Sequence, residues 1–323
     1  MRKERKIVGL LLFLVSLALA SCAAGIEYDT SPFEIPAGTV VLSFAVTADM
    51  REYTGPDMRY FRGACERLAT GGPGEFMISP GDIDPPGAVY NDIRTYIGSD
   101  YVWYPVVGNH EAETPADMTW LRAFNPGGNS LPNVVKPGPA NGVETSFSFD
   151  YGDVHFAVIN EYYDGSSDTG TVGDVTDALH TWLAADLTAN TRPIVFVIGH
   201  EPAFPQPDKE SGRVRYIDAS LNMFETNRDR FWQTLTDNSV TAYICGHTHN
   251  YSAVKINADG VIDGSGYNVW QIDVGHARGY ADTGARSTFV MFYVMDDGSV
   301  WHTTYRLNLA SHNYELTEKR QIP

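Results

Sequence analysis

Seven polar side chains that could act together stand directly after short apolar runs of the sequence. They comprise two carboxylates, one amide and four imidazoles, and most of them are preceded by glycine. This set of oxygen and nitrogen donors suits Zn, Mn or Fe, and it is large enough for two ions. Each residue taken alone is weak evidence for a functional site, because a histidine at the end of a strand more often has a structural role. The residues are Asp49, Asp82, Asn109, His110, His200, His247 and His249.

Short apolar, β-branched runs alternate with amphipathic stretches and predict an α/β fold. Because ligands in open α/β sheets gather outside the carboxyl ends of the strands, the seven side chains are expected to converge on one crevice. Two predicted hairpins, 145–149 with 154–159 and 289–295 with 300–305, make the sheets mixed. The other predicted strands are 40–47, 76–79, 102–107, 194–198, 241–245 and 269–274, and the predicted helices include 58–69, 175–187 and 226–236.

The composition indicates a soluble globular protein with an acidic surface. The 323 residues are 43% hydrophobic and 20% charged, which argues against a disordered chain, a collagen or a coiled coil. With 23 basic and 40 acidic residues the formal net charge is −17, so duplex nucleic acid is an unlikely partner. No repeat or low-complexity block interrupts residues 39–323, which are interpreted as one domain.

The first residues have the pattern of a secretory signal. Four basic residues precede an apolar run of about 14 residues, shorter than the roughly 20 that cross a bilayer. The run closes on Leu19-Ala20-Ser21-Cys22, which resembles the lipobox of bacterial lipoproteins. We therefore predict a lipoprotein signal peptide at 1–21, a tether at 22–38, and attachment to a membrane of the cell envelope through lipidated Cys22, on the periplasmic or extracellular face.

Taken in order, the motifs resemble those of the calcineurin-like metallophosphoesterases, the superfamily that includes the purple acid phosphatases. That family has Asp-x-His, Gly-Asp, Gly-Asn-His-Glu/Asp, a lone histidine after a strand, and Gly-His-x-His. Further likeness lies in the stretch from Phe147 to Phe156 and in Gly199-His200-Glu201-Pro202. The match spans about residues 40–300. The resemblance implies a four-layer α/β/β/α sandwich of two mixed β-sheets flanked by helices.

The resemblance also implies a role for each motif residue. Asp82 would bridge two metal ions, whose identity among Fe, Mn and Zn stays open. Asn109, His200 and His247 would complete the coordination of one ion, and Asp49 and His249 would coordinate the other. His110 would face the substrate, as a proton donor to the leaving group or as an electrostatic clamp.

The chain departs from the family pattern beside the first aspartate. Where the family often has histidine two residues later, the sequence has Arg51, which stays protonated and cannot bind a cation. The tyrosine that purple acid phosphatases supply three residues after the bridging aspartate is Pro85 here. Asp84, His276 or water could fill the gap, or Arg51 could grip the substrate phosphate as a catalytic residue.

Several other residues have two interpretations. Glu201 and Tyr251 flank motif histidines and either line the pocket or hold neighbouring loops. Cys65 and Cys245 are interpreted as small buried residues, with a disulfide between them as the alternative. The aromatic residues Tyr101, Trp103, Tyr104, Tyr162 and Tyr163 are either core residues or a stacking wall for a nucleobase.

The expected function is metal-dependent hydrolysis of a small phosphomono- or diester outside the cytoplasm. Two ions held about 3.5–4 Å apart can hold a hydroxide nucleophile and neutralise phosphoryl oxygens, so no nucleophilic serine or cysteine is needed. The alternative is a phosphate-ligand-binding protein with weakened catalysis, because one ligand position is altered. The retained His110 argues against that alternative.

Overall fold

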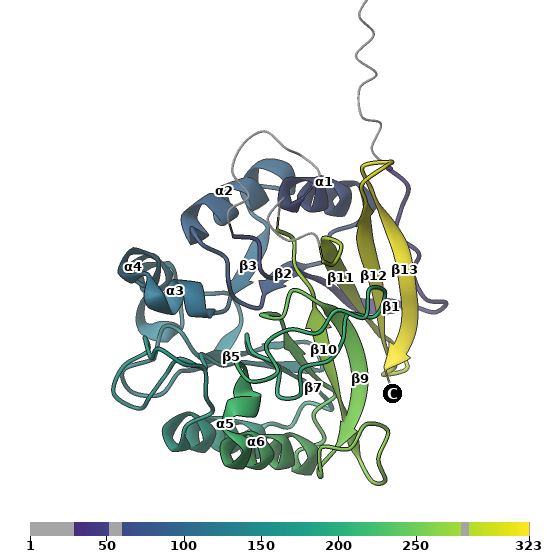
Figure 1. The fold of residues 1–323 in the computed structure, drawn as a ribbon. Coiled ribbons are helices and arrows are strands. Elements are labelled where there is room, and N and C mark those ends of the chain that lie inside the picture. The colour runs from purple at the N-terminus through teal and green to yellow at the C-terminus, as the bar shows by residue number, and fades with distance from the viewer. Residues whose placement is uncertain (1–28, 52–59, 279–283, 323) are drawn as a thin grey trace, which may run out of the picture.

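The computed structural model describes residues 29–51, 60–278 and 284–322. Two mixed sheets face each other in this part of the chain (Figure 1). The six-stranded sheet has the order β13-β12-β11-β1-β2-β3, with bounds Asn313–Ile322, Val300–Asn308, Thr288–Met295, Val40–Val46, Phe76–Ser79 and Val102–Pro105. The seven-stranded sheet has the order β4-β5-β6-β7-β8-β10-β9, with bounds Val134–Pro137, Phe147–Tyr151, Val154–Val158, Ile194–Ile198, Ala242–Cys245, Asn268–Val274 and Tyr251–Asn257.

The central core lies between the two sheets. Successive side chains of a strand point to opposite faces, so Phe44 faces this core while Ala45 faces the helices outside. The ring of Phe44 stacks on Phe292 of its own sheet at 4.9 Å between centroids and meets Phe196 of the facing sheet at 5.4 Å. Aromatic packing of this kind joins the two sheets into one unit.

Helices cover the outer face of each sheet and complete the four-layer α/β/β/α sandwich (Figure 1). Apolar residues of α1, α2 and α4 pack on the six-stranded sheet, and those of α5 and α6 pack on the seven-stranded sheet. The fold predicted from the sequence is therefore confirmed. The helices are α1 Phe61–Gly71, α2 Pro86–Tyr96, α3 Asn109–Glu113, α4 Pro115–Phe124, α5 Asp177–Ala189 and α6 Glu225–Asp237, with 3-10 turns at Pro126–Gly128 and Leu221–Met223.

The strands that carry the motif residues run parallel within each sheet. β1, β2 and β3 are parallel neighbours, as are β6, β7, β8 and β10. Their carboxyl ends therefore meet at one edge of each sheet, where the predicted ligands follow.

The cysteines and four of the five aromatic residues with two interpretations are core residues, and Tyr101 is partly buried against the core. Trp103 and Tyr104 are 1% exposed and pack on opposite faces of β3. Tyr162 and Tyr163 are also buried. Cys65 and Cys245 are free and lie in different outer cores, so the disulfide alternative is wrong.

The predicted signal peptide and Cys22 lie outside the described residues and stay predictions. Part of the predicted tether is described, and it packs on the domain: Phe33 is 5% exposed and its ring lies 4.6 Å from that of Tyr305. The Phe33 amide also donates to the Gly71 carbonyl. Contacts with the domain therefore begin before residue 39. No helix in the described ranges is long and apolar enough to cross a membrane.

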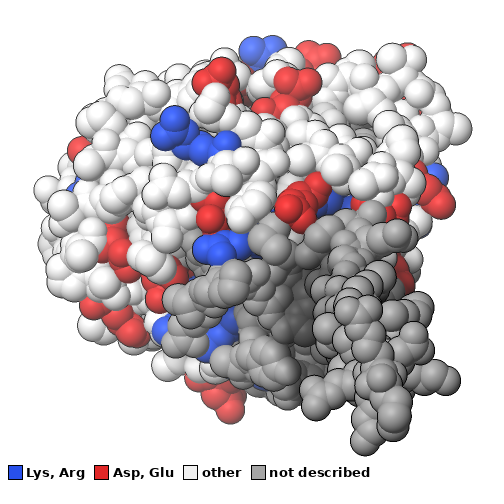
Figure 2. Space-filling view, turned by 90° about the horizontal axis from the view of Figure 1, so that it is seen from above, with Lys and Arg blue, Asp and Glu red and all other residues white. Residues whose placement is uncertain are grey.

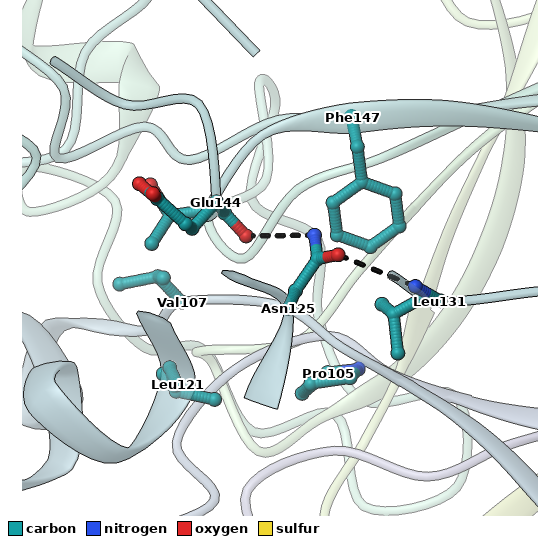
Figure 3. Close-up of a pocket in the computed structure, with 8 residues that line it drawn as sticks. Pro105, Val107, Leu121, Asn125, Leu131, Glu144 and Phe147 are labelled. Carbon is teal, nitrogen blue, oxygen red and sulfur yellow. Dashed lines mark hydrogen bonds between the residues drawn. The ribbon is translucent and has the colours of Figure 1, made fainter. Parts of the chain in front are cut away.

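Two cavities lie in the described part of the chain, the smaller one just past the end of β3. A small one of about 10 Å³ is lined by Asn125, whose side chain donates to the Glu144 carbonyl and accepts from the Leu131 amide (Figure 3). It has room for about one water molecule. A larger one of about 420 Å³ lies where β1, β6 and β7 begin, lined by residues such as Leu42 and Ile194. Neither cavity contains a predicted ligand.

Candidate metal centre

The loops that follow β1, β2 and β8 bring four predicted ligands together in an unusual backbone conformation. Asp49, Asp82, His247 and His249 have φ of 53°, 51°, 68° and 58°, the left-handed region that side chains other than glycine rarely adopt. Such strain persists only where the surrounding structure enforces it, and it concentrates at functional sites. Here it turns side chains from separate loops toward one another.

Asp49 is fully buried and holds two of these loops together. Its Oδ2 accepts a hydrogen bond of 2.9 Å from the amide of His247, while its Oδ1 has no hydrogen-bond partner among the described residues. A Cβ at Gly246 would lie 2.6 Å from Oδ2, so this position requires glycine. A buried carboxylate oxygen without a donor is costly unless a cation lies beside it, and a protonated His249, whose Nε2 is 3.4 Å away, or a metal ion can be that cation.

Glu111 fixes the loop that carries Asp82 to the start of α3. Its carboxylate accepts the amides of Asp82 at 2.9 Å, Ile83 at 2.8 Å and Gly108 at 2.8 Å. The His110 amide donates to Asp82 Oδ1 at 3.2 Å, so α3 also contacts the proposed bridging carboxylate directly. Asn109 is half-buried and is the first residue of α3. Its two chain neighbours, Gly108 and His110, make the contacts with Glu111 and Asp82.

His200 and His247 face each other through the ring nitrogens that would both carry lone pairs if the two rings were neutral. His200 Nδ1 donates to the Pro80 carbonyl at 2.8 Å, and His247 Nε2 donates to the Ala219 carbonyl at 2.7 Å. The remaining nitrogens, His200 Nε2 and His247 Nδ1, are 3.2 Å apart. Two lone pairs directed at each other repel, so the arrangement needs a proton or a metal ion between them.

The charges around these two histidines favour a cation. Burial alone would lower the pKa of His200, but the carboxylates of Asp82 and Asp49 raise it to about 9. Burial and the charge of His200 lower the pKa of His247 to about 4. The pair therefore holds one positive charge next to Asp82, whose Oδ1 is 3.4 Å from His200 Nε2. A divalent ion can replace that proton.

A second group of ligands adjoins the first through Asp82. Donor atoms of Asp49, Asp82 and His249 all lie within 4.8 Å of one another, and the three side chains are buried. His249 Nε2 is 3.4 Å from Asp49 Oδ1, while Arg215 contacts His249 Nδ1 at 2.7 Å. These three residues can hold a metal ion at this position.

His110 and Arg51 lie together at the more exposed side of the centre. His110 Nε2 is 3.6 Å from Asp82 Oδ2 and contacts the Arg51 guanidinium. Arg51 Nε is 3.4 Å from Asp84 Oδ1. Asp84 is thus engaged with Arg51, although the sequence left it as a possible ligand for the under-coordinated ion.

His276, the other candidate for the missing ligand, is held by backbone groups. Its Nε2 donates to the Ala285 carbonyl at 3.1 Å, and its Nδ1 accepts the Arg278 amide at 3.2 Å. Its ring lies 5.6 Å from that of His249 and supports it. Both nitrogens are therefore engaged with the backbone, which favours the structural interpretation of His276.

The family sequence profile described as calcineurin-like phosphoesterase matches residues 42–251, which include all six predicted metal ligands. The chain belongs to the calcineurin-like phosphoesterase family. Membership supports hydrolase activity on phosphoesters at a metal-dependent site. No curated protein is similar enough in sequence to match the chain.

Solved structures match the chain at low sequence identity, and the match to PhoD supports the fold. PhoD is 10% identical with a TM-score of 0.55, and the match covers 91% of this chain and 74% of that one. A single mutant of Vps29 from Entamoeba histolytica is 13% identical with a TM-score of 0.41, covering 87% and 99% of the two chains. Vps29 from Chaetomium thermophilum is 12% identical with a TM-score of 0.42, covering 88% and 98%.

The sequence analysis missed the buried carboxylates that hydrogen-bond to the loops carrying the predicted metal ligands. Besides Glu111, Glu161 accepts the amides of His200 at 2.9 Å and Glu201 at 2.7 Å. Glu201 itself accepts the Tyr162 hydroxyl at 2.7 Å and is buried, so it supports loops. Tyr251 is likewise buried, and its hydroxyl donates to Glu318. Glu111 and Glu161 both adjoin predicted strand ends, but only the structure identifies their long-range partners.

Proposed function

We propose that the protein hydrolyses a small phosphomono- or diester at a dinuclear metal centre. The observation that carries the proposal is the pair of opposed nitrogens on His200 and His247, 3.2 Å apart, with their other nitrogens committed to carbonyls. Asn109, His200 and His247 would hold one ion and Asp49 and His249 the other. Asp82 would contact both. The buried Asp49 oxygen without a donor supports the second position.

Bound ions would supply Lewis-acid neutralisation of the phosphoryl oxygens and a water that ionises near neutral pH. The chain's own residues then orient the ester. His110, with a side chain that is 28% exposed, is placed to give a proton to the leaving oxygen. Arg51 is placed beside His110 to contact a phosphoryl oxygen, with its charge balanced by Asp84 in the absence of substrate.

The place of action is proposed from the sequence alone. The lipobox-like Leu19-Ala20-Ser21-Cys22 supports lipid attachment outside the cytoplasm. The net charge of −17 disfavours long nucleic acids as substrates. Acidic and basic side chains are interspersed on the face drawn in Figure 2, without a large basic patch among the described residues. A small ester is therefore the preferred substrate class.

The test is hydrolysis of aryl phosphate and phosphodiester substrates by purified protein before and after chelation. Activity should disappear with the chelator and return with Mn, Zn or Fe. Asp82→Asn should lose both metal and rate, whereas His110→Ala should keep the metal and lose rate. Asp100→Asn, at an exposed carboxylate, is the matched control and should change neither. Full activity of His110→Ala on every ester would refute its catalytic role.

One observation favours the alternative of a phosphate-binding protein with weakened catalysis. Asp84 is engaged with Arg51 and His276 with backbone groups, so Asp49, Asp82 and His249 remain the protein ligands of one ion. In that case the protein would bind inorganic phosphate in the presence of metal and release no product from any ester. Calorimetry with phosphate alongside the hydrolysis assay separates the two functions.

A further inference from the structure

The segment Arg213–Ala219 crosses the metal centre beside its histidines. Arg213 donates to the His249 carbonyl at 3.0 Å, and Arg215 contacts His249 Nδ1 at 2.7 Å. Farther along, the Ala219 carbonyl accepts from His247 Nε2 at 2.7 Å. The segment therefore touches both histidines of the Gly-His-x-His motif, although the sequence gave it no role.

Tyr216 lies directly against a proposed metal ligand. Its ring centroid is 4.6 Å from that of His247, with 31° between the planes. Arg215 also packs on the Tyr216 ring, with its guanidinium carbon 4.4 Å from the ring centroid and a donor 2.5 Å from the hydroxyl. Tyr216 also has a φ of 54°, a left-handed value that is rare for an aromatic residue. The ring is thus held in place next to the centre.

The segment exposes apolar surface at this position. Burial alternates along residues 213–216: Arg213 and Arg215 are half-buried, while Val214 and Tyr216 are exposed. Val214 and Ile217 are each 47% exposed and Tyr216 is 37% exposed. Exposed apolar side chains in a segment that contacts a polar centre mark a place where a ligand's apolar part can be buried.

We propose that Val214, Tyr216 and Ile217 form a subsite for an aromatic or otherwise apolar organic group of the ester. The inference rests on the proposed function, because it places this group next to a phosphate held at the metal centre. Because His247 and Arg215 already pack against the Tyr216 ring, an aromatic substituent would meet its exposed edge in an edge-to-face contact, whereas a polyhydroxylated group such as glycerol would gain nothing there. The substrate class is then an aryl or hydrophobic phosphate ester rather than a sugar phosphate.

The experiment compares phenyl phosphate with glycerol phosphate in the wild type and in Tyr216→Asn. Asparagine removes the ring but tolerates the left-handed conformation, so folding is preserved. Tyr216→Asn should lower kcat/KM for phenyl phosphate by about 2- to 12-fold, mainly through KM, and leave glycerol phosphate within about twofold. Tyr216→Phe, which keeps the ring, should restore the preference. Tyr267→Asn, at another exposed tyrosine, is the control.

Binding of phenylphosphonate and methylphosphonate, measured by calorimetry with manganese present, separates the two proposals. If the wild type binds phenylphosphonate more tightly and Tyr216→Asn abolishes the difference, the subsite stands even if no ester is hydrolysed. Equal binding of the two phosphonates by the wild type would overturn the subsite and leave the proposed hydrolysis intact. Equal losses on both phosphate esters in Tyr216→Asn would also overturn it.

Discussion

Replacing Glu111 with glutamine tests whether one buried carboxylate sets the geometry of the metal centre. Glu111 is fully buried, and its two oxygens accept the amides of Asp82, Ile83 and Gly108 at 2.8–2.9 Å. Glutamine offers one oxygen, which can keep the two bonds made by Oε2. Its NH₂ group then faces the amide of Ile83, donor against donor.

The expected loss of stability in Glu111→Gln comes from the Ile83 amide, which has no acceptor in the variant. A buried donor left without an acceptor costs about 1–3 kcal/mol, so Glu111→Gln should lower the free energy of unfolding by that amount. Glu111→Ala leaves three buried amides without an acceptor. At about 1–3 kcal/mol each, the free energy of unfolding falls by roughly 3–9 kcal/mol, which approaches the whole stability of a domain. Because Ile83 directly follows Asp82, loss of the Ile83 hydrogen bond releases the backbone beside that predicted ligand, so Glu111→Gln should also weaken metal binding.

The assay is urea unfolding of metal-free protein, followed by calorimetric titration with manganese. Glu113→Gln is the matched control, since Glu113 is exposed on the same short helix and should change stability by less than about 0.5 kcal/mol. A Glu111→Gln protein with the stability and the metal affinity of the control would refute the reasoning. A loss of stability without any loss of metal affinity would show that Glu111 supports the fold but not the ligands.

Three further predictions concern other parts of the chain. Burial alone would lower the pKa of His155, but Asp186 at 3.0 Å and Asp150 at 2.8 Å raise it. Arg192 and Lys136 still face the two carboxylates without His155, so His155→Gln should cost about 1.5–3 kcal/mol in urea unfolding below the unfolded pKa of about 6.5, and less as pH rises through the raised folded value; a pH-independent cost would contradict this. Arg51→Ala should reduce kcat/KM roughly 10- to 150-fold with metal content unchanged, and a more active Arg51→His beside an unimpaired Arg51→Ala would reject the phosphate contact. Cys22→Ser should lose lipid labelling and membrane retention, and equal labelling in both proteins would reject the lipoprotein signal.

The sequence predicted most of the layers because their signals are local. The apolar run Ile194–Ile198 is buried on both faces and was predicted with its observed bounds. β13 was missed because it is an edge strand in which charged residues alternate with partly buried ones, so its apolar signal is weak. α2 was missed because Pro85-Pro86-Gly87 indicates a turn, although proline also suits the first residue of a helix.

In the candidate site, too, some features could be predicted from the sequence and others could not. The convergence of the proposed ligands could be predicted because each follows a strand end, and parallel strands bring such ends together. The partner of Arg51 could not, because Asp84 comes from a different loop and only tertiary structure places the two within 3.4 Å. Tyr216 was also beyond prediction, since a loop residue of ordinary composition carries no periodic signal.

The most direct test of the dinuclear centre is anomalous diffraction from crystals of the protein loaded with manganese or zinc. Two peaks about 3.5–4 Å apart should appear, one beside the opposed nitrogens of His200 and His247 and one beside Asp49 and His249, with Asp82 between them. Active, metal-loaded protein with no peak at either position would contradict the account.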